Sequence, residues 1–265
     1  MFSKILVPVD FSTCSKNALR LAVDFASKNQ SQLTILHVYS AISAQNLPEE
    51  IAKDNLIKDL ESYTSEISML TSIHYELEVQ LGLAADVIIE KSAAFDLTIM
   101  GTRGEHGVID RLIGSVALRV IEHSSTPILV IPEHLQTISF DKIVFAADFK
   151  KIDHLSNLDS LRELALRYDS ELHLLNVNES PEYLTEEEGD EALELHRFFK
   201  DVNHAFFFSQ NKDIEKGIST YAHEKDIAVL ALMPRKHAFL QSLFHQSITE
   251  DLAMHLNSAL LTFHE

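Results

Sequence analysis

Lys4-Ile-Leu-Val-Pro-Val-Asp10-Phe11 returns later in the chain as Lys142-Ile-Val-Phe-Ala-Ala-Asp148-Phe149. Each copy is a short apolar run closed by an aspartate, which is typical of a buried strand followed by a turn. Further blocks recur in the same order: residues 33–38 return as 172–177, and residues 115–116 return as 247–248. Matched blocks in one order indicate a duplicated domain.

Strand and helix patterns alternate within each half. Apolar runs predict strands at residues 5–9, 33–38, 73–79, 97–100 and 128–131, and at 143–147, 172–177, 204–209, 227–231 and 259–263. Helical apolar spacing falls between the strands of the first half, in the segments 19–26, 56–70, 84–94 and 115–122. This alternation predicts βαβ units. The expected fold class is therefore α/β, with two tandem open-twisted parallel sheets and flanking helices, Rossmann-like and related by a pseudo-two-fold axis.

The predicted domains are residues 1–135 and 136–265, joined by a linker around 132–141. The polar, acidic stretch 178–190 reads as a solvated excursion. The last strand of each half would expose an unpaired edge, so we expect residues 128–131 and 259–263 to pair with each other.

Composition excludes several classes of function. The net charge is −18 and both halves are acidic, so neither offers the basic face that nucleic-acid binding needs. No apolar run reaches the roughly 18–20 residues of a membrane span, and the first residues read as a strand and not as a signal peptide. Cys14 is the single cysteine, which excludes an intrachain disulfide and favours a reducing, cytoplasmic setting.

Glycines cluster in one place. Four of the seven, Gly101, Gly104, Gly107 and Gly114, fall between a predicted strand and a helix that starts near Ser115. In open parallel sheets, ligands sit beyond the carboxyl ends of the strands, and helix N-termini attract anions. Glycines at this point let the backbone approach phosphates.

Gly101-Thr-Arg-Gly104, nine residues and then Gly114-Ser115 match the pattern G-x2-G-x9-G-[S/T]. In this the sequence resembles the universal stress protein family, whose ATP-binding signature has that form. Four further pieces are also similar to the family: the opening residues 5–12, the strand end His37-Val38, and the segments 114–123 and 126–131. The resemblance covers nearly all of the first half and the second half more weakly, and tandem members are familiar in this family.

The resemblance implies roles for particular residues in binding ATP or AMP. Asp10 would bind the ribose, the Val38 backbone would meet the adenine, and Met100 and Gly101 would line the sugar and base, with Pro8 in the same set. The phosphates would be held by four further residues: Gly104, Gly114, Ser115 and Val116. Magnesium or manganese would accompany the nucleotide. The family also makes a homodimer plausible, together with a separate protein partner whose identity the sequence does not give.

Purely structural roles for the same residues remain open. Ser115 also fits a plain helix N-cap, Asp10 a cap for the first helix, and the glycines tight turns. The expected function is a stress-response regulator that binds an adenine nucleotide. The alternatives are a slow ATP hydrolase, although no general base is identifiable near the loop, and a nucleotide-free interaction protein.

The second half departs from the glycine pattern. At an offset of 132, Gly101 becomes Met233, Gly104 becomes Lys236 and Gly114 becomes Gln246, while Ser115 persists as Ser247. Side chains at these positions would block phosphates, so we expect no ATP binding by this half. No two of its histidines stand at i, i+4 spacing, so we expect scattered surface positions without a metal site, while a metal site and pH sensing stay open as alternatives. The histidines are His196, His204, His223, His237, His245, His255 and His264.

Overall fold

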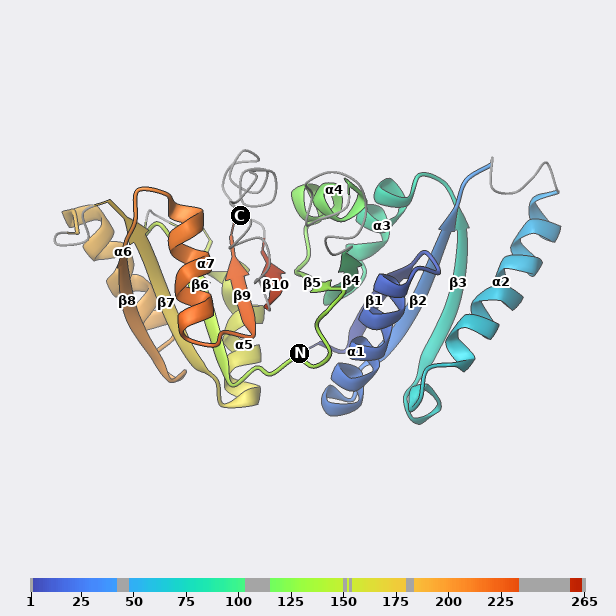
Figure 1. Cartoon of the computed structure of the whole chain (residues 1–265), viewed down its shortest axis with the longest axis horizontal. Helices are drawn as coiled ribbons and strands as arrows, with labels where there is room; N and C mark the ends of the chain where they lie inside the picture. Colours follow the sequence, from blue (N-terminus) through green and yellow to red (C-terminus); the bar gives the residue numbers. More distant parts are fainter. Residues whose placement is uncertain are drawn as a thin grey trace. The chain divides into compact units, whose positions relative to one another are not determined.

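The computed structural model describes residues 2–41, 48–102, 115–149, 152, 154–179, 184–233 and 258–263. The chain has an α/β fold and divides into two compact units, one reaching Gln136 and one continuing from Thr137 (Figure 1). The predicted domain boundary lies beside this division. Among the described residues, no helix is both long and apolar enough to cross a bilayer.

The first unit is built on five parallel strands in the order β3-β2-β1-β4-β5. They are β1 (Lys4–Val9), β2 (Gln32–Tyr39), β3 (Tyr75–Leu81), β4 (Leu97–Thr102) and β5 (Ile128–Pro132). The central strand β1 is apolar and buried along nearly its whole length, as expected for a parallel strand covered on both faces. The predicted strands of this half are therefore present, with ends shifted by one or two residues.

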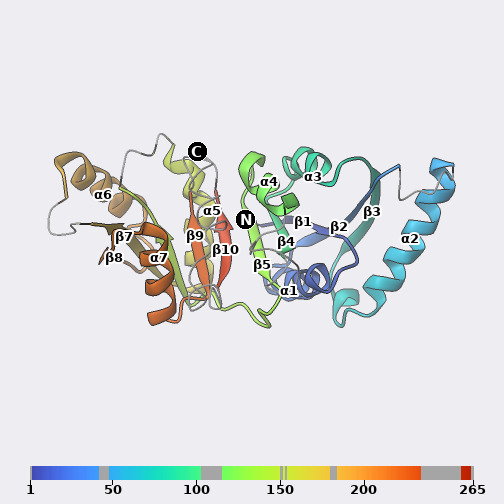
Figure 2. The same cartoon turned by 45° about the horizontal axis from the view of Figure 1, so that its top comes forward.

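Among the described residues, four helices connect these strands: α1 (Thr13–Asn29), α2 (Glu49–Ser65), α3 (Ala84–Ser92) and α4 (Ser115–His123). Because crossovers between parallel strands are right-handed, the reversal of strand order after β3 puts α3 and α4 on the face opposite α1 (Figures 1 and 2). The α2 stripe was predicted to run on to Leu70. The helix instead ends at Ser65, and Leu70 packs from a short 3₁₀ turn, Leu70–Ser72.

The second unit repeats this plan with five parallel strands in the order β10-β9-β6-β7-β8. They are β6 (Lys142–Ala146), β7 (Glu171–Asn178), β8 (His204–Gln210), β9 (Val229–Leu232) and β10 (Ala259–Thr262). Its described helices are α5 (Asp159–Tyr168), which comes after a 3₁₀ turn at Leu155–Leu158, α6 (Glu186–Phe198) and α7 (Ile214–Glu224).

The strand registers reproduce the sequence repeat. Ile5 pairs with Leu97 across β1 and β4, and Ile143 pairs with Val229 across β6 and β9. These pairs are related by the offsets of 138 and 132 that relate the sequence blocks. The duplication is thus preserved residue by residue in the hydrogen-bonded ladders.

The described residues of the stretch 178–190, predicted as a solvated excursion, are exposed or half-buried, but α6 begins within this stretch. The Thr185 side chain accepts a hydrogen bond from the Glu188 backbone N–H, while the Glu188 carboxylate accepts one from the Thr185 N–H. This capping box satisfies two backbone donors at the helix start. The consecutive glutamates Glu186, Glu187 and Glu188 then lie in the first turn, where the helix dipole favours negative charge.

Candidate functional site

Several predicted site residues lie at the carboxyl edge of the first sheet. Val9 pairs with His37, so Asp10 comes next, beside Val38 on the neighbouring strand. On the other side, Ile5 pairs with Leu97, and the same register continued by four residues sets Val9 beside Gly101. β1 leads into α1 on one face, while β4 leads toward α4 on the other. The edge between β1 and β4 is therefore the topological switch point at which open α/β sheets bind ligands.

The turn after β1 is held by Asp10 and two serines. Ser12 donates to Asp10 Oδ1 from its backbone N–H at 3.1 Å and from its hydroxyl at 2.5 Å. Ser12 is also the N-cap of α1, because its Oγ accepts from the Ser15 N–H at 3.2 Å. Asp10 therefore orients the cap and is not the cap itself. Its carboxylate is exposed.

Phe11, between these residues, has a φ of 62°, in the left-handed region that a bulky side chain adopts only at a cost. Its ring stacks at a tilt on His37, with centroids 4.3 Å apart, and meets Tyr63 edge-on at 5.3 Å. His37 Nδ1 lies 2.9 Å from the carbonyl oxygen of Val9 and closes the end of β1. These contacts hold a strained turn in one conformation beside Asp10.

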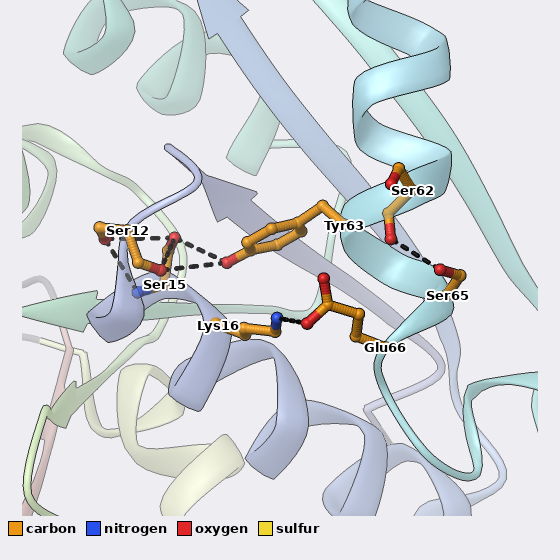
Figure 3. Close-up of polar contacts among 7 residues, drawn as sticks. All are labelled: Ser12, Ser15, Lys16, Ser62, Tyr63, Ser65 and Glu66. Carbon is orange, nitrogen blue, oxygen red and sulfur yellow. Dashed lines mark hydrogen bonds and ion pairs between the residues drawn. The ribbon is translucent and has the colours of Figure 1, made fainter.

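Tyr63 ties α2 to this turn. From α2 its hydroxyl donates to the Ser12 carbonyl oxygen at 3.2 Å and lies 3.0 Å from Ser15 Oγ (Figure 3). Burial, with the nearby Asp10 charge, raises the pKa of Tyr63 to about 12, although the Ser15 hydrogen bond opposes the shift. The phenol is therefore neutral at physiological pH. One turn away, Lys16 forms an ion pair with Glu66 (Figure 3).

Gly101 has a packing role in addition to its place at the edge. A Cβ atom built on it would lie 2.5 Å from the carbonyl oxygen of Cys14 and 2.7 Å from the carbonyl carbon. Both are backbone atoms of the first turn of α1, which therefore lies directly on β4. Only glycine allows this approach of α1 to β4. The packing of α1 therefore requires a glycine at position 101 independently of the predicted contact with sugar and base.

Cys14 itself is buried, and burial raises the pKa of its thiol, with the contact to Glu133 as the next cause. The thiol is therefore protonated and poorly suited to act as a nucleophile. The burial of Cys14 is consistent with a small side chain that serves in packing.

The remaining predicted residues lie on both sides of the edge. Pro8 and Met100 are buried within β1 and β4, and Val38 is half-buried in β2. Ser115 is the first residue of α4, and both Ser115 and Val116 are exposed there. Gly104 and Gly114 lie outside the described residues.

Sequence reasoning assigned no role in the site to Phe11, His37 and Tyr63. No motif marks Tyr63, since it reads as one more apolar position in a helical stripe. The signal that could have drawn attention to Phe11 is its return as Phe149, which also has a positive φ, of 50°.

The prediction of scattered histidines is wrong for one pair. His196 Nδ1 lies 2.9 Å from His204 Nε2. In the part of the chain that the structure describes, no group of three or more histidine, cysteine or carboxylate side chains could hold a metal ion.

Comparisons with known proteins agree with this architecture. The sequence model described as "Universal stress protein family" matches residues 1–132. Universal stress protein YxiE of Bacillus subtilis is 31% identical over 149 residues, which cover 49% of this chain and 99% of that protein. A universal stress protein structure from Archaeoglobus fulgidus has 18% identity and a TM-score of 0.72, covering 99% of this chain and 98% of that one. A universal stress protein solved in complex with cAMP has 20% identity and a TM-score of 0.38, covering 49% and 96%.

Proposed function

This chain belongs to the universal stress protein family, and we propose that its first unit binds an adenine nucleotide, ATP or AMP, as a regulatory ligand. The observation that carries the proposal is the meeting of Asp10, Val38 and Gly101 at the carboxyl edge of the sheet. This is the place where folds of this class bind ligands.

Asp10 would accept hydrogen bonds from the ribose hydroxyls. A carboxylate has about four lone-pair sites, so Asp10 can hold Ser12 and a ribose together. The hydrogen bonds from Ser12 fix the direction of the carboxylate before any ligand arrives, and Tyr63 fixes Ser12 in turn. Such preorganisation reduces the entropy lost on binding. The adenine would lie against the Val38 backbone and Met100, with Pro8 closing the strand end.

The phosphates would extend toward α4. Its first turn has no acidic side chain, and exposed Ser115 and Val116 offer backbone N–H groups to an anion at the positive end of the helix dipole. Gly104 and Gly114 would let the loop backbone close over the phosphates. Arg119, later in α4, forms an ion pair with Asp86 and is not assigned to the phosphates. Magnesium or manganese would be held mainly by phosphate oxygens, as is usual for metal–nucleotide complexes.

We assign the nucleotide a regulatory role, and neither Tyr63 nor Cys14, which both lie at the turn after Asp10, can serve as a general base. Tyr63 stays protonated and Cys14 is a buried neutral thiol, whereas hydrolysis needs a group that positions or activates water. In this proposal the protein acts in the cytoplasm, and nucleotide occupancy biases a surface that meets a protein partner or a second copy of the chain.

Calorimetric titration of the full chain with ATP, ADP, AMP and cAMP tests the proposal. We expect micromolar binding of at least one of the first three, with a stabilisation of about 2.7 kcal/mol at a hundredfold excess over the dissociation constant. Gly114→Asp puts a carboxylate against the phosphates and should abolish binding. The matched control, Gln246→Asp in the second unit, should leave it unchanged. Absence of heat and of a thermal shift with every nucleotide at millimolar concentration would refute the proposal, and steady turnover of ATP would replace the regulatory role by a hydrolytic one.

A further inference from the structure

The second unit contains a pair of histidines at the junction of α6 and β8. His196 lies in the last turn of α6, and His204 is the first residue of β8. Their rings have centroids 5.0 Å apart, and His196 Nδ1 is 2.9 Å from His204 Nε2. The first unit lacks the counterpart of His204. Tyr75 takes that place in β3, since Leu33 pairs with Tyr75 as Leu172 pairs with His204.

The hydrogen bonds of His204 define which nitrogen atoms carry protons. Its Nδ1 donates to the carbonyl oxygen of Val202 at 2.9 Å, so in the neutral ring Nε2 has a free lone pair. His196 Nδ1 therefore donates the proton between the rings. A backbone carbonyl that accepts the second ring N–H is also the usual outer-shell partner of a metal-bound histidine, because it fixes the tautomer and the ring orientation.

The segment between the two histidines is anchored in the core. Phe199 is fully buried and Val202 nearly so, and the Val202 N–H donates to the Phe199 carbonyl oxygen at 2.8 Å. The Phe199 N–H in turn donates to Leu195, one residue before His196, at 2.9 Å. Little conformational freedom is therefore left to lose when a ligand brings the two rings together.

We propose that His196 Nδ1 and His204 Nε2 together bind a divalent transition-metal ion, with Cu²⁺ preferred. Metal–imidazole bonds are about 2.0–2.1 Å long, so two nitrogens in cis positions at a right angle are about 2.9 Å apart. The hydrogen bond already holds the two ring nitrogens at this separation, so an ion can replace the shared proton without moving the nitrogens apart. Right angles belong to the tetragonal coordination of Cu²⁺ and Ni²⁺, whereas the tetrahedral geometry of Zn²⁺ needs a wider separation. Water fills the remaining positions.

Binding has no net proton cost when both rings are neutral. The shared proton leaves His196 Nδ1 and returns to His196 Nε2 through solvent, so one tautomer replaces another and the metal takes the place of the proton. His196 is exposed and His204 half-buried, so the ion can enter with its water ligands.

The surrounding charges include one exposed lysine, Lys200, and otherwise favour a cation. His196 lies near the C-terminal end of α6, where backbone carbonyls carry the negative end of the helix dipole. The neighbouring arginines are paired with carboxylates, Arg197 with Glu194 and Arg162 with Asp201. The chain as a whole carries −18.

Titration of the full chain with Cu²⁺ as the only metal ion tests the proposal. Glycine is present in the buffer as a competing chelator. We expect His196→Asn, which retains a hydrogen-bond donor, and His204→Ala to weaken the first Cu²⁺ equivalent at least about tenfold, since even outer-shell substitutions cost 10–100-fold. His223→Ala, an exposed histidine on α7, is the matched control and should bind like wild type. Melting curves without metal check that each variant is folded.

Paramagnetic broadening of histidine ring resonances gives a second measurement that does not depend on affinity. The first substoichiometric Cu²⁺ should broaden His196 and His204 before the other histidines. If His196→Asn bound the first equivalent as tightly as wild type, or if other histidine signals broadened first, the pair would be a hydrogen-bonded contact and no metal site.

Discussion

The carboxyl ends of the two sheets begin alike and then diverge. In both units the first strand leads to an aspartate and then to a phenylalanine with left-handed backbone, Phe11 at a φ of 62° and Phe149 at 50°. In both units, a side chain of the second strand forms a hydrogen bond with a backbone carbonyl oxygen at the end of the first strand. His37 Nδ1 meets the Val9 carbonyl oxygen at 2.9 Å, and Asn176 Nδ2 donates to that of Ala147 at 3.2 Å.

Beyond the aspartate the two units differ. In the first unit α1 begins at Thr13, three residues after Asp10, and its first turn lies against Gly101. In the second unit the next described helical turn after Asp148 is a 3₁₀ turn that starts only at Leu155, and α5 begins at Asp159. The first helix lies against a strand glycine in the first unit, whereas the counterpart of Gly101 in the second unit is Met233. The strand ends preserve the fold in both units, while the helix start and the glycine form the candidate site in one.

The largest effect should come from Gly101→Ala, at the point where the two units diverge. The added Cβ would lie 2.5 Å from the Cys14 carbonyl oxygen, and backbone atoms cannot move aside as a flexible side chain can. We expect a loss of about 3 kcal/mol, at the upper end of the cost of overpacking, together with loss of nucleotide binding. Met233→Ala should cost less than about 1 kcal/mol, because Met233 is only half-buried. Urea denaturation measures both, and equal losses would contradict the contrast between the units.

Two buried tyrosines provide a test of intermediate size. Both have a pKa raised by burial to about 12, but Tyr63 bonds to the turn after Asp10, whereas Tyr221 on α7 lies 2.8 Å from His173 Nδ1 on β7. Tyr221→Phe leaves a buried ring nitrogen without its partner and should cost about 2 kcal/mol. Tyr63→Phe should cost about 1 kcal/mol and also weaken nucleotide binding severalfold. Urea denaturation and calorimetric titration measure the two effects.

The control for the tyrosines is the crossed measurement, nucleotide affinity in Tyr221→Phe, which should equal that of wild type. Discrimination between ATP and 2′-deoxy-ATP adds a readout that a purely structural role would not change. It should shrink in Tyr63→Phe, because Ser12 and Asp10 are then less firmly oriented. Unchanged discrimination would remove Tyr63 from the site.

The smallest effect concerns pH and belongs to the second unit. His173 is buried and stacked on Phe207, and burial lowers its pKa although Glu171, with Oε1 3.2 Å from Nε2, opposes the shift. The unfolded histidine has a pKa of about 6.5, so below that pH the unfolded chain binds the proton more readily than the folded chain. The free energy of unfolding should therefore fall as the pH falls from about 7.5 to about 5.5.

Urea denaturation of wild type and His173→Gln at both pH values isolates this contribution from that of the other histidines. The wild type should lose more stability on acidification than the variant. A parallel decline in the two proteins would show that His173 does not contribute.

Much of the fold could be predicted from local pattern. Local patterns located each of the ten described strands to within about two residues. Strands such as β1 are nearly all apolar because they are buried on both faces, whereas β3 was recognised by its alternation of polar and apolar residues. The repeat also predicted which strands correspond. The sequence-based predictions fail where one residue pattern is compatible with two kinds of local structure. The acidic run after Asn178 reads as a solvated excursion, yet its charges suit the first turn of a capped helix.

For the candidate site, the glycine series and the position of Asp10 after the first strand can be read from the chain alone, since both depend on the order of residues along one βα connection. The partners of these residues come from the packing of distant elements. Tyr63 reaches Ser12 across 51 positions because the right-handed crossovers set α2 beside the start of α1. His196 meets His204 because a buried turn folds α6 back onto β8. Contacts of this kind depend on how elements pack in space, and no periodicity in the chain encodes them.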